Sequence, residues 1–228
     1  MAKKATIKDI KDAIDEAFKN YLTSRSPELD PILNNLPNDI RSGKLYEAHV
    51  LALVAERLVL EENCTLTLKN GSHVYLKSSP GPINRNFPYI EVHRDGVLLG
   101  EMFTDVEFTT LSHYLSNNPP QKSCYYHELD ILLTKPNPNH RPYHHEILLG
   151  IECKNTAFQK SLYRAALGVR RELSLLSDST NTSFRQWPST ILPCNPASCF
   201  IVFGSDDKIL NYTESGAVFG IQFVYSDY

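Results

Sequence analysis

The chain lacks long apolar runs and has no large excess of either charge. No stretch approaches the roughly 18 consecutive apolar residues of a membrane-spanning helix, and polar sequence follows the N-terminus where a signal peptide would have its apolar core. We therefore expect a cytoplasmic protein with no membrane partner. The formal net charge of −3 argues against a protein that coats nucleic acid non-specifically, because such proteins are strongly basic.

The cysteines give neither a disulfide framework nor a zinc motif. There are five, an odd number, dispersed at positions 64, 124, 153, 194 and 199. Internal repeats and low-complexity tracts are also absent from the sequence. With 228 residues the chain can bury one good core, whereas two full domains would be cramped. We expect one domain over residues 1–228, with an N-terminal helical extension over 1–41 and a core from about 42 to 228.

The most informative feature present is the tetrapeptide 151–154, Ile-Glu-Cys-Lys, at the end of an apolar run. On a strand, alternate side chains share a face, so Glu152 and Lys154 would project to the same side. The apolar stretch before it, residues 125–133, carries Asp130 and reads as a neighbouring strand. Pairing of the two strands would bring two carboxylates and a lysine together.

That combination suits hydrolysis of a phosphodiester bond, which needs a hard cation and an activated water. Oxygen ligands from Asp130 and Glu152 favour Mg²⁺, with Mn²⁺ as a substitute, and Lys154 could hold the water or offset phosphate charge. The alternative is coincidence, because Glu-x-Lys arises by chance on the order of once in a few hundred residues. Its position at the end of a buried strand favours the catalytic interpretation.

A third carboxylate, Glu47, lies in a helix expected over residues 44–60. At helical spacing it shares its face with a set of apolar side chains: Val50, Leu51, Val54 and Leu58. A carboxylate on a core-facing stripe is costly unless a metal, a lysine or a bound water pairs with it. The alternative is that Glu47 reaches solvent from the first helical turn, where the helix dipole favours negative charge.

Together these residues resemble the PD-(D/E)XK superfamily of restriction-endonuclease-like nucleases, over roughly residues 42–205. The resemblance implies an α/β fold with an α-β-β-β-α-β core, in which helices flank a mixed central β-sheet. It also implies that Asp130 and Glu152 hold Mg²⁺, that Lys154 is the catalytic lysine and that Glu47 is the helix glutamate of many members. The chain departs from the pattern in having Leu129, and not proline, before the aspartate.

Other residues compete for, or add to, this set. Cys153 is expected to pack under the sheet with its backbone carbonyl near the metal. Asp105 and Glu107 share one face of a further strand and are the chief rivals to Asp130 as ligands. Ordinary surface alternation is the simpler interpretation of both.

A group of three histidines, His140, His144 and His145, precedes Glu146 and suggests a transition-metal site at first sight. The group overlaps a proline-rich turn over residues 136–143, between two expected strands. We interpret it as a solvated hairpin loop.

A helix expected over residues 156–176 carries a basic face. Lys160, Arg164 and Arg171 lie on roughly one side of it, with Arg170 nearby, and could follow a phosphate backbone. The spacing of Gln159 and Tyr163, four residues apart, is similar to a motif in an exonuclease branch of the family. A solvated helix face is the alternative.

Turn signals and periodicity predict the remaining elements. Thr6 and Asp9 form a capping signal before an amphipathic helix. Hairpins are expected around Asn70-Gly71 and around Asp95-Gly96. A further strand is expected over 101–108, and closing strands over 197–203 and 218–225.

The sequence thus predicts a Mg²⁺-dependent deoxyribonuclease, an endonuclease of restriction or anti-phage defence type, with DNA as its partner. The defence role follows from the resemblance alone. Because the chain is slightly acidic, a defence-system partner protein or a homodimer mate would supply further binding. The alternatives are a nuclease acting on RNA, and a catalytically weak module of the same fold that binds nucleic acid or serves assembly.

Overall fold

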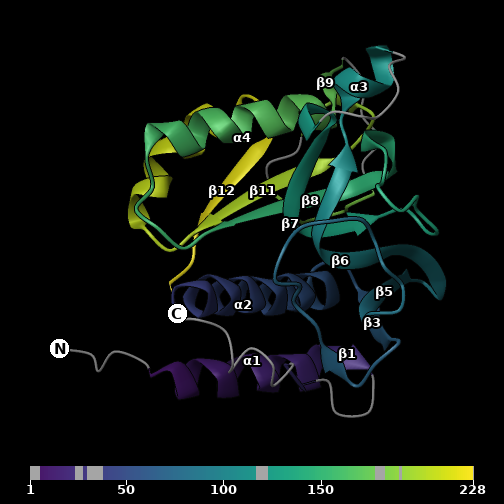
Figure 1. Ribbon diagram of the computed structural model, residues 1–228, viewed down its shortest axis with the longest axis vertical. Coiled ribbons are helices and arrows are strands. Elements are labelled where there is room, and N and C mark those ends of the chain that lie inside the picture. Colours follow the sequence, from purple (N-terminus) through teal and green to yellow (C-terminus); the bar gives the residue numbers. More distant parts are fainter. Residues whose placement is uncertain are drawn as a thin grey trace.

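The computed structural model describes residues 6–23, 28–29, 38–116, 123–177, 183–189 and 192–227. Within these ranges the chain is a mixed α/β structure with an eight-stranded sheet flanked by helices (Figure 1). The expected α/β class with a mixed, helix-flanked sheet is confirmed. No helix in the described ranges has both the length and the apolar character to cross a membrane. The expected division into one domain stays a prediction.

The helices are α1 (Ile7–Tyr21), α2 (Asn38–Leu60), α3 (Leu111–Ser116), α4 (Lys160–Leu173) and α5 (Thr213–Ala217). The strands are β1 (Leu22–Thr23), β2 (Glu28–Leu29), β3 (Cys64–Lys69), β4 (His73–Val74), β5 (Tyr89–Arg94), β6 (Val97–Thr109), β7 (Tyr126–Thr134), β8 (Ile147–Lys154), β9 (Leu175–Leu176), β10 (Cys194–Asn195), β11 (Cys199–Gly204) and β12 (Ile221–Tyr225). Three 3-10 helices complete the described elements: η2 (Ser123–Tyr125), η3 (His144–Glu146) and η4 (Asp207–Tyr212).

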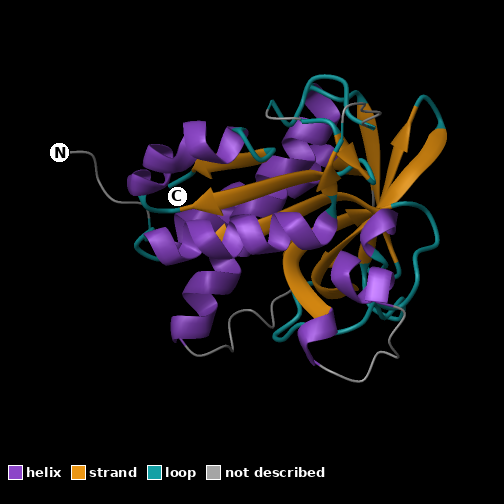
Figure 2. Cartoon of the chain, turned by 90° about the horizontal axis from the view of Figure 1, so that it is seen from above, coloured by secondary structure: helices purple, strands orange, loops and turns teal. Residues whose placement is uncertain are grey.

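The large sheet has the order β1-β3-β5-β6-β7-β8-β11-β12. Its centre is antiparallel from β3 to β8, and β11 and β12 then continue it in parallel with β8. A parallel neighbour needs a crossover, which α4 provides between β8 and β11. Figure 2 shows that the strands turn progressively across the sheet, as the right-handed twist of strands requires.

The two faces of the sheet carry separate cores. One contains residues of α1 and α2, and the other contains residues of α4, including Ala166 and Leu173. In Figure 1, α4 covers one face while α2 and then α1 lie in layers against the other. Because α2 lies between α1 and the sheet, it is apolar around most of its circumference, and the residues it directs at the sheet are held rigidly.

The first helix forms as its sequence predicts. Thr6 and Asp9 make a reciprocal capping box, and the helix buries one stripe, Ile10, Ile14 and Phe18. Ile7, in the first turn, is 55% exposed. The second helix begins at Asn38 and not at Lys44, so it is longer than its apolar stretch alone predicts.

The hairpin expected around Asn70-Gly71 is wrong. β3 pairs with β5 along its whole length on one edge, and with β1 at Leu66 and Thr67 on the other. β4 pairs instead, in parallel, with β2. The Asp95-Gly96 hairpin is confirmed between β5 and β6, and both turn residues have positive φ, 53° and 76°. β6 then continues to Thr109, so the strand expected over 101–108 is part of it.

The later elements follow the sequence more closely. The helix expected over 156–176 is shorter, Lys160–Leu173, and Leu175–Leu176 forms β9 instead of a last helical turn. The closing strands β11 and β12 are confirmed, with each end within three residues of the expected one.

Candidate metal centre

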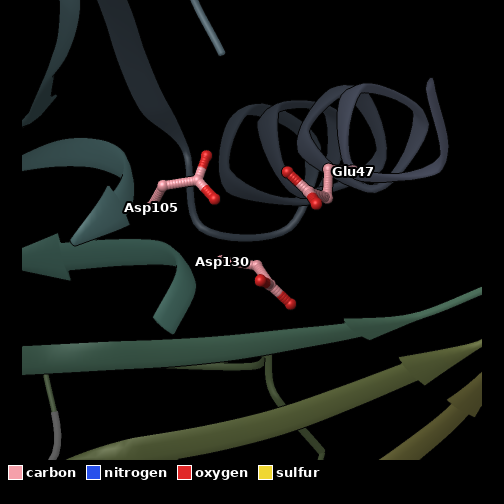
Figure 3. A group of neighbouring side chains, drawn as sticks. All are labelled: Glu47, Asp105 and Asp130. Atoms are coloured by element: carbon pink, nitrogen blue, oxygen red, sulfur yellow. The ribbon is translucent and has the colours of Figure 1, made fainter. Parts of the chain in front are cut away.

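Three carboxylates from distant parts of the sequence converge between α2 and the sheet. Glu47 projects from α2, Asp105 from β6 and Asp130 from β7, and one oxygen of each lies within 4.8 Å of the others (Figure 3). Among the described residues this is the only group of three or more potential ligands that meets this distance. Oxygen donors arranged in this way can hold a metal ion.

A break in strand alternation places Asp105 in this group. Phe103 and Val106, three residues apart, both pack in the core on the α4 side, so one residue between them departs from regular alternation. Asp105 has a φ of +50°, an uncommon conformation for a residue with a side chain. Its carbonyl accepts hydrogen bonds from Lys77 Nζ at 2.8 Å and from the Gly81 N–H at 3.2 Å. These contacts stabilise the irregular backbone.

The interpretation of Asp105 as a surface residue is therefore wrong. The residue is 5% exposed and its side chain points into the molecule, because the positive φ turns it out of the alternation that the sequence suggests. Glu107, the other rival, is half-buried and pairs with Arg141 at 2.8 Å, away from the three carboxylates. No sequence signal marks an aspartate with positive φ inside a long strand.

Lys44, one helical turn before Glu47, is a residue that sequence reasoning missed. Its Nζ lies 2.6 Å from Glu47 Oε2 and 2.5 Å from Asp105 Oδ1, and the residue is 8% exposed. Burial alone would lower the pKa of Lys44, but the charges of Glu47 and Asp105 outweigh it and raise that pKa. Lys44 is therefore a fixed cation. The i,i+3 spacing was the available signal, since it puts both side chains on one helix face.

Asp130 lies where the regular alternation of β7 side chains between the two faces of the sheet is interrupted. Leu129 packs in the core on the α4 side, whereas Ile131, two residues on, packs in the core on the α2 side. The regular pairing of β7 with β8 extends as far as Ile131 and Ile151. Beyond it, Asp130 Oδ2 accepts a hydrogen bond from the backbone N–H of Cys153 at 2.6 Å. This bond ties the Asp130 carboxylate to the strand that carries the Glu-x-Lys motif.

Glu152 and Lys154 pair with each other at 2.5 Å. Burial, and next the charge of Asp130, raise the pKa of Glu152 to about 7. Burial alone would lower the pKa of Lys154, but the charges of Glu152 and Asp130 raise it above its ordinary value. The structure thus brings Asp130 close to both groups, although Glu152 lies outside the three-carboxylate cluster. Asp130 is the link between Glu47 and Asp105 on one side and Glu152 and Lys154 on the other.

The carboxylates are electrostatically unfavourable when no cation is bound. Burial, and then the charge of Asp105, raise the pKa of Glu47 to about 8, in spite of its contact with Lys44. Burial likewise raises the pKa of Asp105 to about 6, with Lys44 opposing the shift and Asp130 adding to it. Elevated carboxylate pKa values mean that an added cation would be stabilised here.

One buried atom supports the fit to a cation directly. Asp105 Oδ2 has no hydrogen-bond partner among the described residues, while Oδ1 contacts Lys44. An unpaired buried carboxylate oxygen is costly, and a cation beside Asp130 would satisfy it. The donor set is all oxygen, which suits a hard divalent ion such as Mg²⁺ or Mn²⁺.

Cys153 is half-buried and packs against the core on the α2 side, as expected of a residue under the sheet. Its backbone N–H, and not its carbonyl, makes the contact with Asp130 that the structure shows. Burial, and the nearby carboxylates, raise the pKa of its thiol well above the ordinary value. The thiol is therefore neutral.

Helix α4, which carries the expected basic residues, covers the opposite face of the sheet from α2 (Figure 1). Lys160, Arg164 and Arg171 are exposed, as is Gln159 just before the helix. Arg170 is not part of this surface, because it is 5% exposed and donates to Ser198 Oγ at 2.9 Å.

The histidine loop joins β7 to β8, as expected, but it is not uniformly solvated. His144 is 3% exposed and packs edge-on against Tyr114, with ring centroids 5.0 Å apart. Burial lowers the pKa of His144 to about 4, so it is neutral. The loop is anchored by aromatic packing that its proline-rich sequence does not reveal.

Comparisons of the chain with protein-family models, with curated proteins and with solved structures find no match.

Proposed function

We propose that this protein is a Mg²⁺-dependent nuclease that hydrolyses phosphodiester bonds in DNA, an endonuclease of restriction or defence type acting in the cytoplasm. The observation that carries the proposal is the convergence of Glu47, Asp105 and Asp130, with the Glu152–Lys154 pair beside Asp130. Acidic oxygens that can hold a divalent cation, beside a fixed ammonium, suit metal-assisted hydrolysis of a phosphodiester bond.

The order of elements around the centre supports the same proposal. Helix α2, which carries a carboxylate, is followed after β3, β4 and β5 by three antiparallel strands (β6, β7, β8), with α3 between the first two. A crossover helix (α4) and a strand parallel to β8 (β11) come later in the chain. This order is consistent with the α-β-β-β-α-β core that the sequence resemblance implies. The additional strands β3 and β5 extend the sheet beyond it.

The residues have separable roles in this proposal. Glu47, Asp105 and Asp130 would hold Mg²⁺, which when bound offsets phosphate charge and lowers the pKa of a water. Glu152 orients the Lys154 ammonium through their 2.5 Å contact. Lys154, fixed in its charged state, would then bind the phosphate or orient the attacking water. Cys153 positions Asp130 through its backbone N–H.

The substrate and partners are proposed from the distribution of charge. Exposed Lys160, Arg164 and Arg171 offer positive charge on α4, which follows the Glu-x-Lys strand in the chain. Because the whole chain carries a net charge of −3, a partner protein or homodimer mate would add binding surface. DNA is preferred over RNA on the sequence resemblance alone.

The test is a cleavage assay with purified protein on supercoiled, linear and single-stranded DNA and on RNA. We expect cleavage of DNA with Mg²⁺ or Mn²⁺, little with Ca²⁺, and none in excess EDTA. Lys154→Met should remove cleavage, whereas Lys135→Met, at an exposed lysine outside the centre, should not. Cleavage of RNA alone would move the substrate to RNA. Metal binding without cleavage of any substrate would favour a non-catalytic binding module, and cleavage in EDTA would refute the metal mechanism.

A further inference from the structure

The Lys44 ammonium lies between two of the three carboxylates of the candidate metal centre. It contacts Glu47 Oε2 at 2.6 Å and Asp105 Oδ1 at 2.5 Å, and both contacts are largely shielded from water. An ammonium that bridges two buried carboxylates stands where a cation bridging those carboxylates would stand. Its side chain reaches this position from the same helix as Glu47, one turn earlier.

The charge of the cluster is consistent with a single additional metal ion. Three ionised carboxylates and the Lys44 ammonium leave a formal charge of −2, which one divalent cation neutralises. Without the ammonium the same carboxylates would carry −3 and attract a second cation. In a partly desolvated place this difference matters, because Coulomb interactions are much stronger there than in water.

The two oxygens of Asp105 divide the centre into two cation positions. Oδ1 faces Lys44, and Oδ2 is buried without a hydrogen-bond partner in the described part of the chain. Asp130, the third carboxylate of the cluster, is not a partner of Lys44 in any described contact. The open position therefore lies on the Oδ2 and Asp130 side, and the filled one lies between Oδ1 and Glu47.

We propose that Lys44 is a built-in cation, whose ammonium takes the place of a second divalent ion and limits the centre to one metal ion per chain. The proposal rests on the metal-binding part of the proposed function and not on cleavage. It makes Lys44 a positioning residue, because it orders Glu47 and Asp105 around the open position without itself contacting substrate.

The test is the number of Mn²⁺ ions bound per chain, measured by titration with detection of free Mn²⁺ by electron paramagnetic resonance. We expect one ion for the natural protein and two for Lys44→Met, because the variant exposes a second pair of carboxylates. Lys44→Arg, which keeps the charge, should again bind one. Lys135→Met, which removes an exposed lysine outside the cluster, should also bind one.

Two ions bound by the natural protein would overturn the proposal without need of any variant. One ion with unchanged affinity in Lys44→Met would also overturn it and would reduce Lys44 to a structural ion pair. If Lys44→Met does not fold, Asp105→Asn provides the second variant. It removes the carboxylate that borders both positions, so we expect one ion bound at least tenfold more weakly, and unchanged affinity would refute the two-position arrangement.

The outcomes separate this proposal from the proposed function. One ion in the natural protein and two in Lys44→Met, with no cleavage of any nucleic acid, would support Lys44 as the built-in cation and refute the nuclease. Metal-dependent cleavage, with one ion bound both by the natural protein and by Lys44→Met, would support the nuclease and refute the role of Lys44 as the built-in cation. No Mn²⁺ bound to the natural protein would refute the metal centre and the role of Lys44 together.

Discussion

Asp105 faces Asp130 across strands β6 and β7, with regularly paired residues on both sides of them. Like charges directly opposite each other on neighbouring strands destabilise a sheet. Here the repulsion lies where the regular alternation of side chains between the two sheet faces is broken on both strands. At the same position Lys44 neutralises part of the charge. The metal-free protein therefore keeps a local repulsion that a bound cation would relieve.

The first prediction concerns the catalytic set. Asp130→Ala, Glu152→Ala and Lys154→Ala should each lower the cleavage rate by about a thousandfold or more. A double variant should be little worse than a single one, since groups that act as a unit are strongly non-additive. Single-turnover rates on one DNA substrate measure this. His145→Ala should retain activity, and its inactivation alongside an active Lys154→Ala would move the site to the histidine loop.

The second prediction concerns pH. The pKa of Glu47 is raised from an ordinary 4.5 to about 8, so the folded protein binds a proton that the unfolded chain releases near pH 4.5. The resulting stability is present below that pH and is lost as the pH rises towards 8. The melting temperature of the metal-free protein should therefore decrease as the pH rises from about 5 to 8. Thermal melts in EDTA across this range test it.

Glu47→Gln provides the matched variant for this effect. Glutamine keeps the shape without the charge, so the decline with pH should be smaller, and at pH 8 the variant should be as stable as the parent or about 1 kcal/mol more stable. Mg²⁺ should raise its melting temperature less than that of the parent. A variant that melts several degrees lower at every pH, yet cleaves normally, would show that Glu47 is only a structural partner of Lys44.

The third prediction concerns Glu62, a carboxylate with no exposed surface just beyond the end of α2. It accepts hydrogen bonds from Arg94 at 2.6 Å and from the backbone N–H groups of Arg185, Gln186 and Trp187. Glu62→Ala should lower the free energy of unfolding by about 3–5 kcal/mol, because it leaves a buried guanidinium and several donors unpaired. The same substitution at its neighbour Glu61, in an exposed pair with Arg57, should cost less than about 1 kcal/mol. Urea denaturation of both variants decides this.

The fourth prediction concerns the basic surface of α4. The double variant Arg164→Ala/Arg171→Ala should weaken DNA binding and reduce the salt dependence by about 0.9 in log–log slope for each phosphate that the protein no longer neutralises. Lys8→Ala/Lys135→Ala removes the same charge from exposed positions elsewhere and should change the slope little. Binding is measured in Ca²⁺, where cleavage should be slow. Equal effects of the two pairs would remove α4 from the interface.

Local sequence patterns accounted for much of the fold. The capping signal at Thr6, the Asp95-Gly96 turn and the apolar run before Glu152 each fix their element through neighbours in the chain. The hairpin predicted after β3 was wrong because the pairing of β4 is decided by strands that are distant in the sequence. Whether β4 can join the sheet depends on β5 occupying one edge of β3 and β1 part of the other, which is a property of the assembled sheet.

The candidate site divides in the same way. Asp130, Glu152 and Lys154 were found because adjacent strands and alternation relate them, and Glu47 because a carboxylate on an apolar helix face needs a partner. Asp105 was considered as a rival ligand but assigned to the surface, since its direction depends on a positive φ supported by Lys77 and Gly81. The roles predicted for the residues that were found are tested by the experiments above.

Helix α2 is attached to the rest of the molecule near both of its ends. At one end the Asn155 side chain bonds Ser42 Oγ at 2.8 Å and is itself bonded by Ser205 at 2.8 Å. At the other, the backbone N–H groups that bind the Glu62 carboxylate hold the chain just after the last turn. The number of residues in the helix therefore sets the angle about its axis between Glu47 and Glu62. One extra residue between them would rotate one end by about 100° relative to the other. Insertions and deletions within α2 should thus be far less tolerated than substitutions, because a change in length misaligns either Glu47 or Glu62, whatever residue is inserted.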